Sequence, residues 1–337
     1  MAAQFGTSPT FNVPVMDISP YLKDSSSPEA ANVIEQVRKA CTTTGFFQLT
    51  GHKIPKDLQQ EVLKGSTAFF SLPAEEKEKV DKKFSIGSSN RGYEVVGNQA
   101  LQEGTLPDLR EGFYIGLDLP ATDPRVQSKA FLMGPNQWPS EDVLPATIFR
   151  NPMQTYYPLM VDLAIKVLDI IAAGMSYGPD IFKEFTSNGP VASLRLLHYP
   201  PQTTRDKKQL GSGAHTDFGA ITLLLQDRNP GLQVWDKNGE RWIDIEPNEE
   251  AYVVNVGDML QMWSSGEYKS SIHRVINGDK VDRYSIPFFF DGNINCALKP
   301  FNDKEESSVE NRKWLTVEEH MRERFVTTYA RAGTTVG

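Results

Sequence analysis

Residues Gly213–Asp227 read GAHTDFGAITLLLQD, in which a histidine and a carboxylate stand two residues apart and an apolar strand follows. In an extended chain the side chains of residues i and i+2 lie on the same face, so His215 and Asp217 can reach a single ion. A polar turn that happens to precede a strand would have the same local pattern. A third ligand elsewhere in the chain would favour the metal site.

The chain has five histidines, so the candidates for that third ligand are few. His320 stands among charges in EEHMRER and is predicted to lie on the surface of a terminal helix. His52 follows a strand in the turn TGHKIP, and His198 lies in LRLLHYP, where a packed and hydrogen-bonded histidine is the ordinary interpretation. His273, in SSIHRVI, lies in a second predicted strand of the same C-terminal region and is the best candidate.

Two imidazoles and one carboxylate are the ligand set of non-haem Fe(II) oxygenases, which keep metal positions open. The spacing of His215, Asp217 and His273 also occurs by chance, so the following residues matter. Arg283 and Ser285, in DRYS, share a face of the next strand. A guanidinium offers two parallel hydrogen bonds to a carboxylate, and the hydroxyl adds a third. Beside a metal, this pair indicates an anionic co-substrate; without the metal, a surface ion pair would explain Arg283.

The C-terminal half predicts short strands joined by tight turns, with Asn238-Gly239 as a hairpin signal. The predicted strands lie in SLRLLHYP, AITLLLQD, GLQVWDKNGERWIDIEP, AYVVNVGDMLQMWSSG, SSIHRVING and DRYSIPFFFDG. Together with the helical patterns, they predict an α+β fold whose core is a double-stranded β-helix, the cupin-like jelly roll, with flanking helices. We expect an N-terminal helical and irregular region over residues 1–150. Residues 151–337 would hold a long helix, the jelly-roll core at about 190–295 and a C-terminal helix that begins after Thr316.

The N-terminal half predicts a strand at Phe11–Ser19 and then a helix that begins at Ser27 and ends at Gly45. A further strand at Phe46–Gly51 precedes two helical segments separated by Pro73. The lysines of AEEKEKVDKK alternate with acidic residues and are expected on a solvated helix face; they are Lys77, Lys79, Lys82 and Lys83. The stretch 84–152 has no regular pattern, which is typical of a segment that covers a functional site.

Composition narrows the class of protein. Of the 337 residues, 39% are hydrophobic and 23% charged, and the formal net charge is −8, which argues against nucleic acid or an anionic membrane as a partner. The sequence contains no apolar run long enough for a transmembrane helix and no signal-peptide pattern. With only Cys41 and Cys296, a disulfide framework is not expected, and a reducing cytoplasm is the expected location.

The motifs GAHTDFGAITLLLQD, GLQVW, VVNVGDMLQMWSSGEYKSSIHRV and DRYSIPFF closely resemble the Fe(II)- and 2-oxoglutarate-dependent dioxygenases of the isopenicillin N synthase-like family. VPVMDIS, ACTTTGFFQLTGHKIP, FFSLPAEEKEKV and NRGYEVVG resemble the N-terminal region of that family, so the likeness spans about Phe11–Tyr329. It implies that His215, Asp217 and His273 bind Fe(II). It further implies a reaction in which 2-oxoglutarate and O2 are consumed, succinate and CO2 are released, and a small organic molecule is oxidised, most commonly by hydroxylation.

The resemblance also implies roles for other residues. Arg283 and Ser285 would bind the distal carboxylate of 2-oxoglutarate, and Tyr199 would donate a hydrogen bond to the same co-substrate. LRLLHYP, NRGYEVVG and LREGFYIG look most like fungal members, among them thymine hydroxylase and oxygenases of specialised metabolism. The residues that we expect to contact the substrate are Arg195, Phe289, Asp291, Phe113 and Tyr114.

Other functions share parts of this pattern. An isopenicillin N synthase-type oxidase keeps an Arg-x-Ser pair but uses it on its own substrate, and an ethylene-forming enzyme has no separate prime substrate. A non-catalytic jelly-roll binding protein with a degenerate metal site belongs to another class. The complete set of three ligands with Arg283 and Ser285 disfavours that last alternative. The sequence does not specify the oligomeric state.

Overall fold

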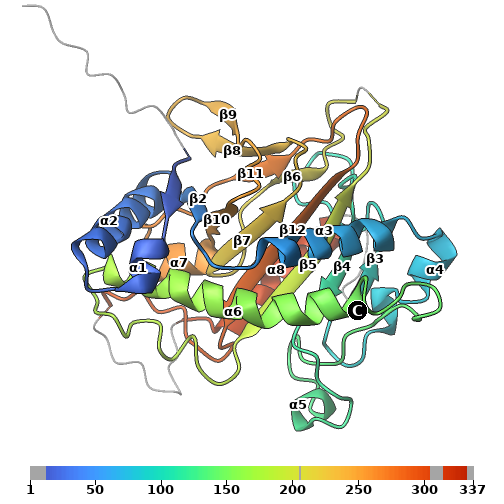
Figure 1. Ribbon diagram of the computed structural model, residues 1–337, viewed down its shortest axis with the longest axis horizontal. Coiled ribbons are helices and arrows are strands. Elements are labelled where there is room, and N and C mark those ends of the chain that lie inside the picture. The colour runs from blue at the N-terminus through green and yellow to red at the C-terminus, as the bar shows by residue number, and fades with distance from the viewer. Residues whose placement is uncertain (1–12, 205, 304–313, 332–337) are drawn as a thin grey trace, which may run out of the picture.

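A computed structural model describes residues 13–204, 206–303 and 314–331. An eight-stranded sheet and a four-stranded sheet make up the core, with strand orders β1-β2-β10-β7-β12-β5-β4-β3 and β6-β11-β8-β9. All strand pairs are antiparallel except β1 with β2. Helices cover the outer face of the larger sheet (Figure 1). The α+β jelly roll with flanking helices is therefore confirmed.

The strands of the larger sheet are β1 (Val15–Asp17), β2 (Phe46–Thr50), β3 (Gly92–Glu94), β4 (Glu111–Ile115), β5 (Val191–Tyr199), β7 (Ile221–Gln226), β10 (Tyr252–Val256) and β12 (Arg283–Gly292). Those of the smaller sheet are β6 (Ser212–His215), β8 (Leu232–Asp236), β9 (Arg241–Asp244) and β11 (His273–Val275). The helices are α1 (Ser19–Lys23), α2 (Pro28–Thr43), α3 (Lys56–Phe70), α4 (Ala74–Glu78), η1 (Lys82–Phe84), α5 (Pro124–Gln127), α6 (Arg150–Ala173), α7 (Asp258–Trp263) and α8 (Val317–Arg331). Among the described residues, no helix is both long and apolar enough to cross a membrane.

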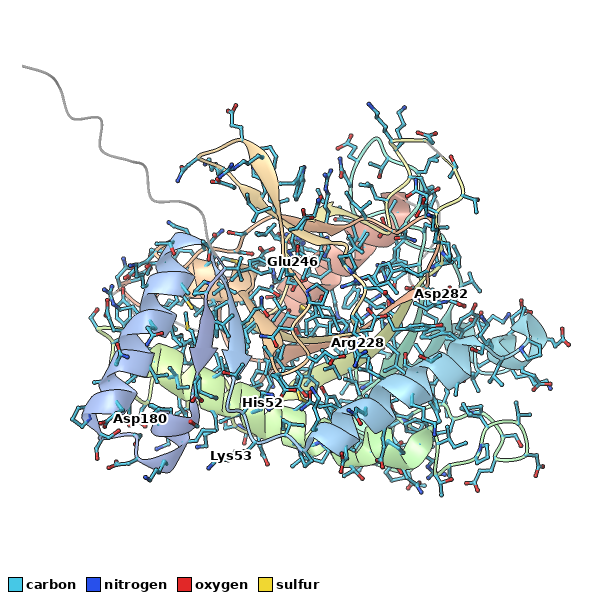
Figure 2. The ribbon with its side chains drawn as sticks, turned by 45° about the horizontal axis from the view of Figure 1, so that its top comes forward. His52, Lys53, Asp180, Arg228, Glu246 and Asp282 are labelled. Atoms are coloured by element: carbon cyan, nitrogen blue, oxygen red, sulfur yellow. The ribbon has the colours of Figure 1, made fainter. Side chains whose placement is uncertain are left out.

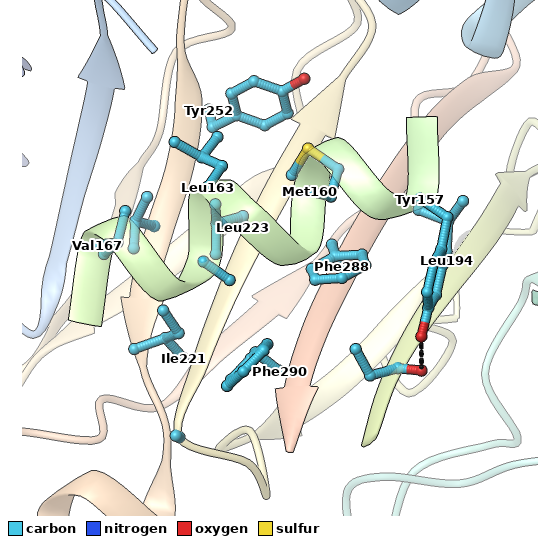
Figure 3. Close-up of a cluster of buried hydrophobic side chains, with 14 of the residues drawn as sticks. Tyr157, Met160, Leu163, Val167, Leu194, Ile221, Leu223, Tyr252, Phe288 and Phe290 are labelled. Atoms are coloured by element: carbon cyan, nitrogen blue, oxygen red, sulfur yellow. Dashed lines mark hydrogen bonds between the residues drawn. The ribbon is translucent and has the colours of Figure 1, made fainter. Parts of the chain in front are cut away.

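The outer face of the larger sheet forms the main hydrophobic core with α6. Side chains alternate between the two faces of a strand, and the outward set includes Leu194, Leu223 and Phe288, all fully buried. Figure 3 shows these side chains beneath α6. The hydroxyl of Tyr157, on α6, donates a hydrogen bond of 3.0 Å to the carbonyl of Ala192 on β5, which fixes the helix on the sheet.

The inner face of the same strands carries the polar residues. Arg283 pairs in register with Tyr199, and Ser285 lies between Leu197 and Gln226 of its two neighbouring strands. All five side chains are buried, and most of them line a pocket between the two sheets. The period of two thus divides β5, β7 and β12 into a packing face and a pocket face.

The segment Gly213–Asp227 is not one strand. β6 ends at His215 and belongs to the smaller sheet, whereas β7 begins at Ile221 and belongs to the larger one. The residues between them cross from one sheet to the other. Their carbonyls bind the start of α7, since the amide of Asp258 donates to the carbonyl of Asp217 at 2.8 Å. Asp217 therefore lies in the crossover and not on a strand, a difference from the sequence prediction.

The N-terminal elements follow the sequence closely. The side chain of Ser27 accepts a hydrogen bond from the amide of Ala30 and caps α2. Gly45 ends that helix with φ of +67°, and a β-carbon there would stand 1.9 Å from the carbonyl oxygen of Lys269, so this turn requires glycine. The strand predicted over Phe11–Ser19 corresponds to β1. The first two residues of the predicted segment, Phe11 and Asn12, lie outside the described ranges.

Two expectations about the N-terminal half are wrong in part. The stretch 84–152, expected to be irregular, contributes β3 and β4 to the larger sheet, where β4 pairs with β5. Lys77 and Lys82 are not solvated. Lys77 donates to Glu111 at 2.7 Å, and Lys82 contacts Glu94, because carboxylates far along the chain lie beneath this helical segment.

Helix α8 also differs from the expected surface helix. Thr316 caps it as predicted, since its hydroxyl accepts from the amide of Glu319. His320, however, is 7% exposed, and its Nε2 lies 3.0 Å from the carbonyl oxygen of Phe218. The helix packs on the crossover between β6 and β7, which draws His320 into the interior.

Candidate active site

Three predicted ligands meet at the open end of the jelly roll. His215 and His273 pair in register across β6 and β11, and their ring centroids are 4.2 Å apart. The Nε2 atoms of the two rings lie 3.8 Å and 3.7 Å from Oδ1 of Asp217. One possible ligand atom from each residue falls within 4.8 Å of the others. This spacing suits one metal ion bound by two imidazoles and a carboxylate.

The backbone sets the orientation of both imidazoles. Nδ1 of His215 lies 2.7 Å from the carbonyl of Gly213, and Nδ1 of His273 lies 3.2 Å from that of Ser271. Since a carbonyl only accepts, each Nδ1 donates a proton to its carbonyl, which makes Nε2 the nitrogen that is available to a metal. Burial and the neighbouring His273 lower the pKa of His215 to about 3, so its ring is neutral and able to bind a metal at physiological pH.

The third ligand is held by the larger sheet. Oδ2 of Asp217 accepts hydrogen bonds from the hydroxyl of Thr222 at 2.6 Å and from the amide of Asn255 at 2.7 Å. Burial opposes ionisation of the carboxyl, but the two imidazoles and these hydrogen bonds outweigh it and lower the pKa of Asp217. Its Oδ1 is left facing the histidines. The carboxylate is thus charged and fixed in direction.

An anion-binding group lies at one end of the pocket. Arg283 is 1% exposed, with Nε donating to the carbonyl of Asn229 and Nη2 to the side chain of Gln226. Its Nη1 is buried and has no hydrogen-bond partner within the described part of the chain. Ser285 is on the same face, and the guanidinium lies 5.1 Å from the ring centre of Tyr199. An unpaired buried guanidinium N–H beside a hydroxyl fits a carboxylate ligand.

Four of the five expected substrate contacts line the opposite end of the pocket: Arg195, Tyr114, Phe289 and Asp291. The guanidinium of Arg195 lies 5.9 Å from the ring centre of Phe289 and contacts the hydroxyl of Tyr114. Burial, and then the charge of Asp217, raise the pKa of Asp291 to about 7. Its Oδ1 is buried without a hydrogen-bond partner among the residues described.

Phe113 is not part of this pocket. It is fully buried on the other face of β4, where its ring packs on Phe69 at 4.5 Å and on Phe149 at 5.3 Å. The neighbouring residue Tyr114 points the opposite way because successive side chains of a strand alternate. The expectation that both aromatic residues contact substrate is therefore wrong for Phe113.

Comparisons with known proteins agree with this geometry. Residues 190–292 match the family model of the 2OG-Fe(II) oxygenase superfamily, and residues 13–141 match the N-terminal model described as non-haem dioxygenase in morphine synthesis. The chain is 51% identical over 326 residues to the 2-oxoglutarate-dependent dioxygenase citB of Monascus ruber, which covers 96% of this chain and 97% of that protein.

Two further comparisons extend the likeness. The clavatol oxidase claD of Penicillium crustosum is 42% identical, with 96% of this chain and 98% of that protein covered. The structure of Neurospora crassa T7H in complex with alpha-KG and 5-formyluracil superposes with a TM-score of 0.77 at 29% identity, over 97% of this chain and 100% of that one.

The chain belongs to the 2OG-Fe(II) oxygenase superfamily. It is a non-haem Fe(II)- and 2-oxoglutarate-dependent dioxygenase, an oxidoreductase that uses O2 and 2-oxoglutarate to oxidise a small organic molecule with release of succinate and CO2. The isopenicillin N synthase-type oxidase, the ethylene-forming activity and the non-catalytic binding protein are not favoured, since the relatives are named as 2-oxoglutarate-dependent dioxygenases.

Several residues of the dioxygenase pocket are not predicted by the sequence motifs. Arg110 lines the pocket beside Gln99, immediately before β4, and Thr222 and Asn255 hold the carboxylate ligand. A polar side chain at an inward position of an otherwise apolar strand, such as Thr222 in ITLLLQ, is a usable signal. The position of Arg110 depends on a loop whose path the sequence pattern does not show.

The last helix closes one side of the dioxygenase pocket. Met321 and Phe325 of α8 are among its lining residues, together with Phe218 from the crossover. Arg324 anchors the helix by donating to the carboxylate of Asp258 at 2.6 Å. The pocket therefore has walls from both sheets and from a helix at the far end of the chain.

Proposed function

We propose that His215, Asp217 and His273 hold the catalytic Fe(II). The observation that carries this proposal is the convergence of two Nε2 atoms and one fixed carboxylate oxygen, with both Nδ1 atoms engaged by backbone carbonyls. When bound, the iron supplies the O2 activation that is coupled to decarboxylation of 2-oxoglutarate. The protein's part is to fix the three ligands on one side and leave the other side to the reactants.

The co-substrate 2-oxoglutarate binds, in this proposal, between the metal ligands and Arg283. Nη1 of Arg283, which lacks a partner among the described residues, and the hydroxyl of Ser285 would donate to its distal carboxylate. Tyr199, opposite Arg283 in the register of β5 and β12, would donate a further hydrogen bond. The apolar side chains of Leu197, Leu232 and Val275 separate this end of the pocket from water and thereby strengthen these charged contacts.

The prime substrate would bind at the other end, over Phe289, with Arg195, Tyr114 and Asp291 as its polar contacts. The reaction is a hydroxylation: a C–H bond of the substrate becomes C–OH with one oxygen atom from O2, while the other atom enters succinate as 2-oxoglutarate loses CO2. The residues of α8 and of the crossover exclude water from the reacting carbon. We also propose that the protein functions in the cytoplasm. The free, buried thiols of Cys41 and Cys296 support this location, because a reducing compartment keeps thiols unpaired.

Binding of 2-oxoglutarate to the anaerobic Fe(II) protein tests both the contact with the metal and the contact with Arg283. We expect a visible charge-transfer absorption in the wild type when 2-oxoglutarate is added. The Arg283→Gln variant should require about 100-fold more 2-oxoglutarate, since the charge-assisted hydrogen bond from Nη1 is lost together with the positive charge. Arg241→Gln, on exposed β9, is the matched control.

The result that would overturn the assignment is an unchanged affinity for 2-oxoglutarate in the Arg283 variant. Loss of the metal from His273→Ala, with an unfolding curve that still shows a cooperative transition, tests the ligand set. If that variant kept wild-type Fe(II) affinity, His273 would not be a ligand. Cell fractionation of the tagged protein in a fungal host tests the cytoplasmic location, which recovery in a membrane or organelle fraction would contradict.

A further inference from the structure

Two buried arginines meet at a single neutral oxygen in the pocket. Oε1 of Gln99 accepts a hydrogen bond of 2.6 Å from Nη2 of Arg110 and one of 3.2 Å from Nη2 of Arg195. Arg110 is 5% exposed, and the side chain of Arg195 is 14% exposed. Like charges that converge on an uncharged acceptor repel each other unless an anion joins them.

The charges around the pair leave one positive charge in excess. In the described part of the chain, Lys82, Arg110 and Arg195 form ion pairs with two carboxylates, those of Glu94 and Asp108. Burial opposes the ionisation of Glu94, but Lys82, Arg195 and Arg110 lower its pKa, so it already serves as the counter-ion of that group.

Asp108 makes a long ion pair with Arg110. Its Oδ2 lies 3.5 Å from Nη2 of Arg110, while its Oδ1 accepts from the amide of Gly213. Burial raises the pKa of Asp108, against the charge of Arg110, which lowers it. The excess positive charge is therefore located at the two guanidinium groups.

Both guanidinium groups also keep an unused donor. Nε of Arg110 and Nε of Arg195 are buried and lack a hydrogen-bond partner within the described ranges. Both residues line the pocket, and so do the rings of Tyr114 and Phe289. The guanidinium of Arg195 lies 4.1 Å from the centre of the Tyr114 ring. Unsatisfied buried donors next to aromatic rings are the features of a site for a flat, negatively charged ligand.

The meeting point of the two guanidinium groups differs from the position of Arg283. Arg195 stands four residues before Tyr199 on β5, which corresponds to about 13 Å along an extended strand, whereas Arg283 pairs with Tyr199 itself. Arg110 precedes Glu111, which pairs with His198, so its backbone lies near Tyr199, but its Nη2 reaches Oε1 of Gln99 beside Arg195. The pocket thus has a cationic position at Gln99 in addition to that of Arg283.

We propose that the prime substrate is an aromatic acid, a planar ring that carries an anionic oxygen, and that this oxygen binds between Arg110 and Arg195. Phe289 would support the ring, which places the substituent opposite the anionic oxygen nearer to His215, His273 and Asp217. Arg110 is in this way assigned to substrate binding in addition to Arg195. The inference rests on the proposed function, because it takes the Arg283 end to be filled by 2-oxoglutarate.

The test compares 4-methylbenzoate with its uncharged analogue 4-methylbenzamide. Both are titrated calorimetrically into the anaerobic Fe(II) protein saturated with 2-oxoglutarate, so that the Arg283 end is closed to the carboxylate. We expect the wild type to bind the anion at least about tenfold more tightly than the amide, the effect of one charged hydrogen bond. Arg110→Gln and Arg195→Gln should each remove most of that preference, while Arg110→Lys retains part of it.

Arg241→Gln removes a positive charge from the surface and should leave the preference unchanged. Equal binding of the two probes by the wild type would overturn the inference, as would a preference that persists in both glutamine variants. Either result together with normal 2-oxoglutarate binding would leave the proposed function intact. Absence of 2-oxoglutarate binding would instead contradict the proposed function, so the two failures are distinguishable.

Discussion

Asp217 shows how much of the site depends on residues that do not themselves bind the metal. One of its oxygens faces the two imidazoles, and the other is occupied by Thr222 and Asn255. Removal of either hydrogen bond would allow the carboxylate to turn. The side chains that bind the metal, and those that orient its carboxylate ligand, are thus distributed over the two sheets.

We predict that Thr222→Val lowers the affinity for Fe(II) by about 10- to 100-fold, since the loss of a hydrogen bond to a ligating carboxylate has effects of this size. The change keeps the shape of the side chain and removes the hydroxyl. Competition with a chromogenic chelator gives the affinity, and Thr222→Ser is the control that keeps the donor. Equal affinities in the valine and wild-type proteins would contradict this role.

At the residue scale the sequence predicted best where function imposes a pattern. The ligand set and the pair Arg283 and Ser285 follow from spacing, and the structure brings each group together. His320 was misplaced because its partner, the carbonyl of Phe218, lies 102 residues away. The prediction for Phe113 fails because the sequence pattern of 84–152 predicts no strand at Glu111–Ile115, and only a strand sends Phe113 and Tyr114 to opposite faces.

His198, on the outward-facing side of β5, joins this strand to β4 and to the start of β12. Nδ1 of His198 lies 2.7 Å from Glu111 on β4, and its Nε2 lies 2.7 Å from Asp282, just before β12. Figure 2 labels Asp282 on that surface segment. The ring stacks on Tyr284, with centroids 4.9 Å apart, and Lys77 shares Glu111 with it. This is the packed, hydrogen-bonded histidine that the sequence predicts.

We predict a stability that decreases with pH because of His198. Burial opposes its protonation, but the hydrogen bonds to Glu111 and Asp282 outweigh burial and raise its pKa. The folded state therefore binds this proton more tightly than the unfolded chain, whose histidine pKa is about 6.5. The stabilisation is complete below that pH and is lost as the pH rises through the folded-state pKa.

Thermal unfolding of the wild type and of His198→Gln, followed from pH 5.5 upward, measures this contribution. The difference in Tm between them should be largest at the acid end and should shrink as the pH rises. A difference that grows with pH would have the wrong sign. His52→Gln is the control. Burial lowers the pKa of His52, so the difference in Tm between the wild type and this variant should not be largest at the acid end.

Helix α8 supplies a wall of the pocket, and Arg324 is one of the residues that attach it, through Asp258 and Thr216. We predict that Arg324→Gln, which removes the ion pair with Asp258, speeds hydrogen exchange in α8 and raises KM for the prime substrate several-fold. The fold outside the helix should be unaffected. Glu323→Gln, on the exposed side of the same helix, is the matched control; the same exchange rates in both variants would exclude the anchoring role.

At the element scale, alternation and helix capping predicted most strands and helices. The crossover between β6 and β7 could not be predicted, because its hydrogen bonds go to α7, some 40 residues further along the chain. Helix α6 ends at Ala173, where the amide of the C-cap Gly174 donates to carbonyls of the last turn. Local sequence thus determines what an element is, whereas distant contacts determine where it stops.

For the whole molecule, the two faces of β12 separate stability from catalysis. We predict that Phe288→Ala, which empties a fully buried position beneath α6, destabilises the fold by about 3–5 kcal/mol in urea unfolding. The folded fraction should bind 2-oxoglutarate as before. Phe289→Leu, one residue further on, should change substrate binding with little effect on stability. Similar effects of both variants on the free energy of unfolding would contradict this division.

The crossover has a consequence for the entire fold when the metal is considered as a crosslink. Two of its ligands belong to the smaller sheet, and the third is fixed by hydrogen bonds to β7 and β10 of the larger one. An ion bound there ties the two halves of the jelly roll together and is absent from the unfolded chain. Each tenfold rise in free metal above its dissociation constant then adds about 1.4 kcal/mol to the free energy of unfolding. In a cell, the lifetime of this protein against proteolysis would therefore follow the supply of iron.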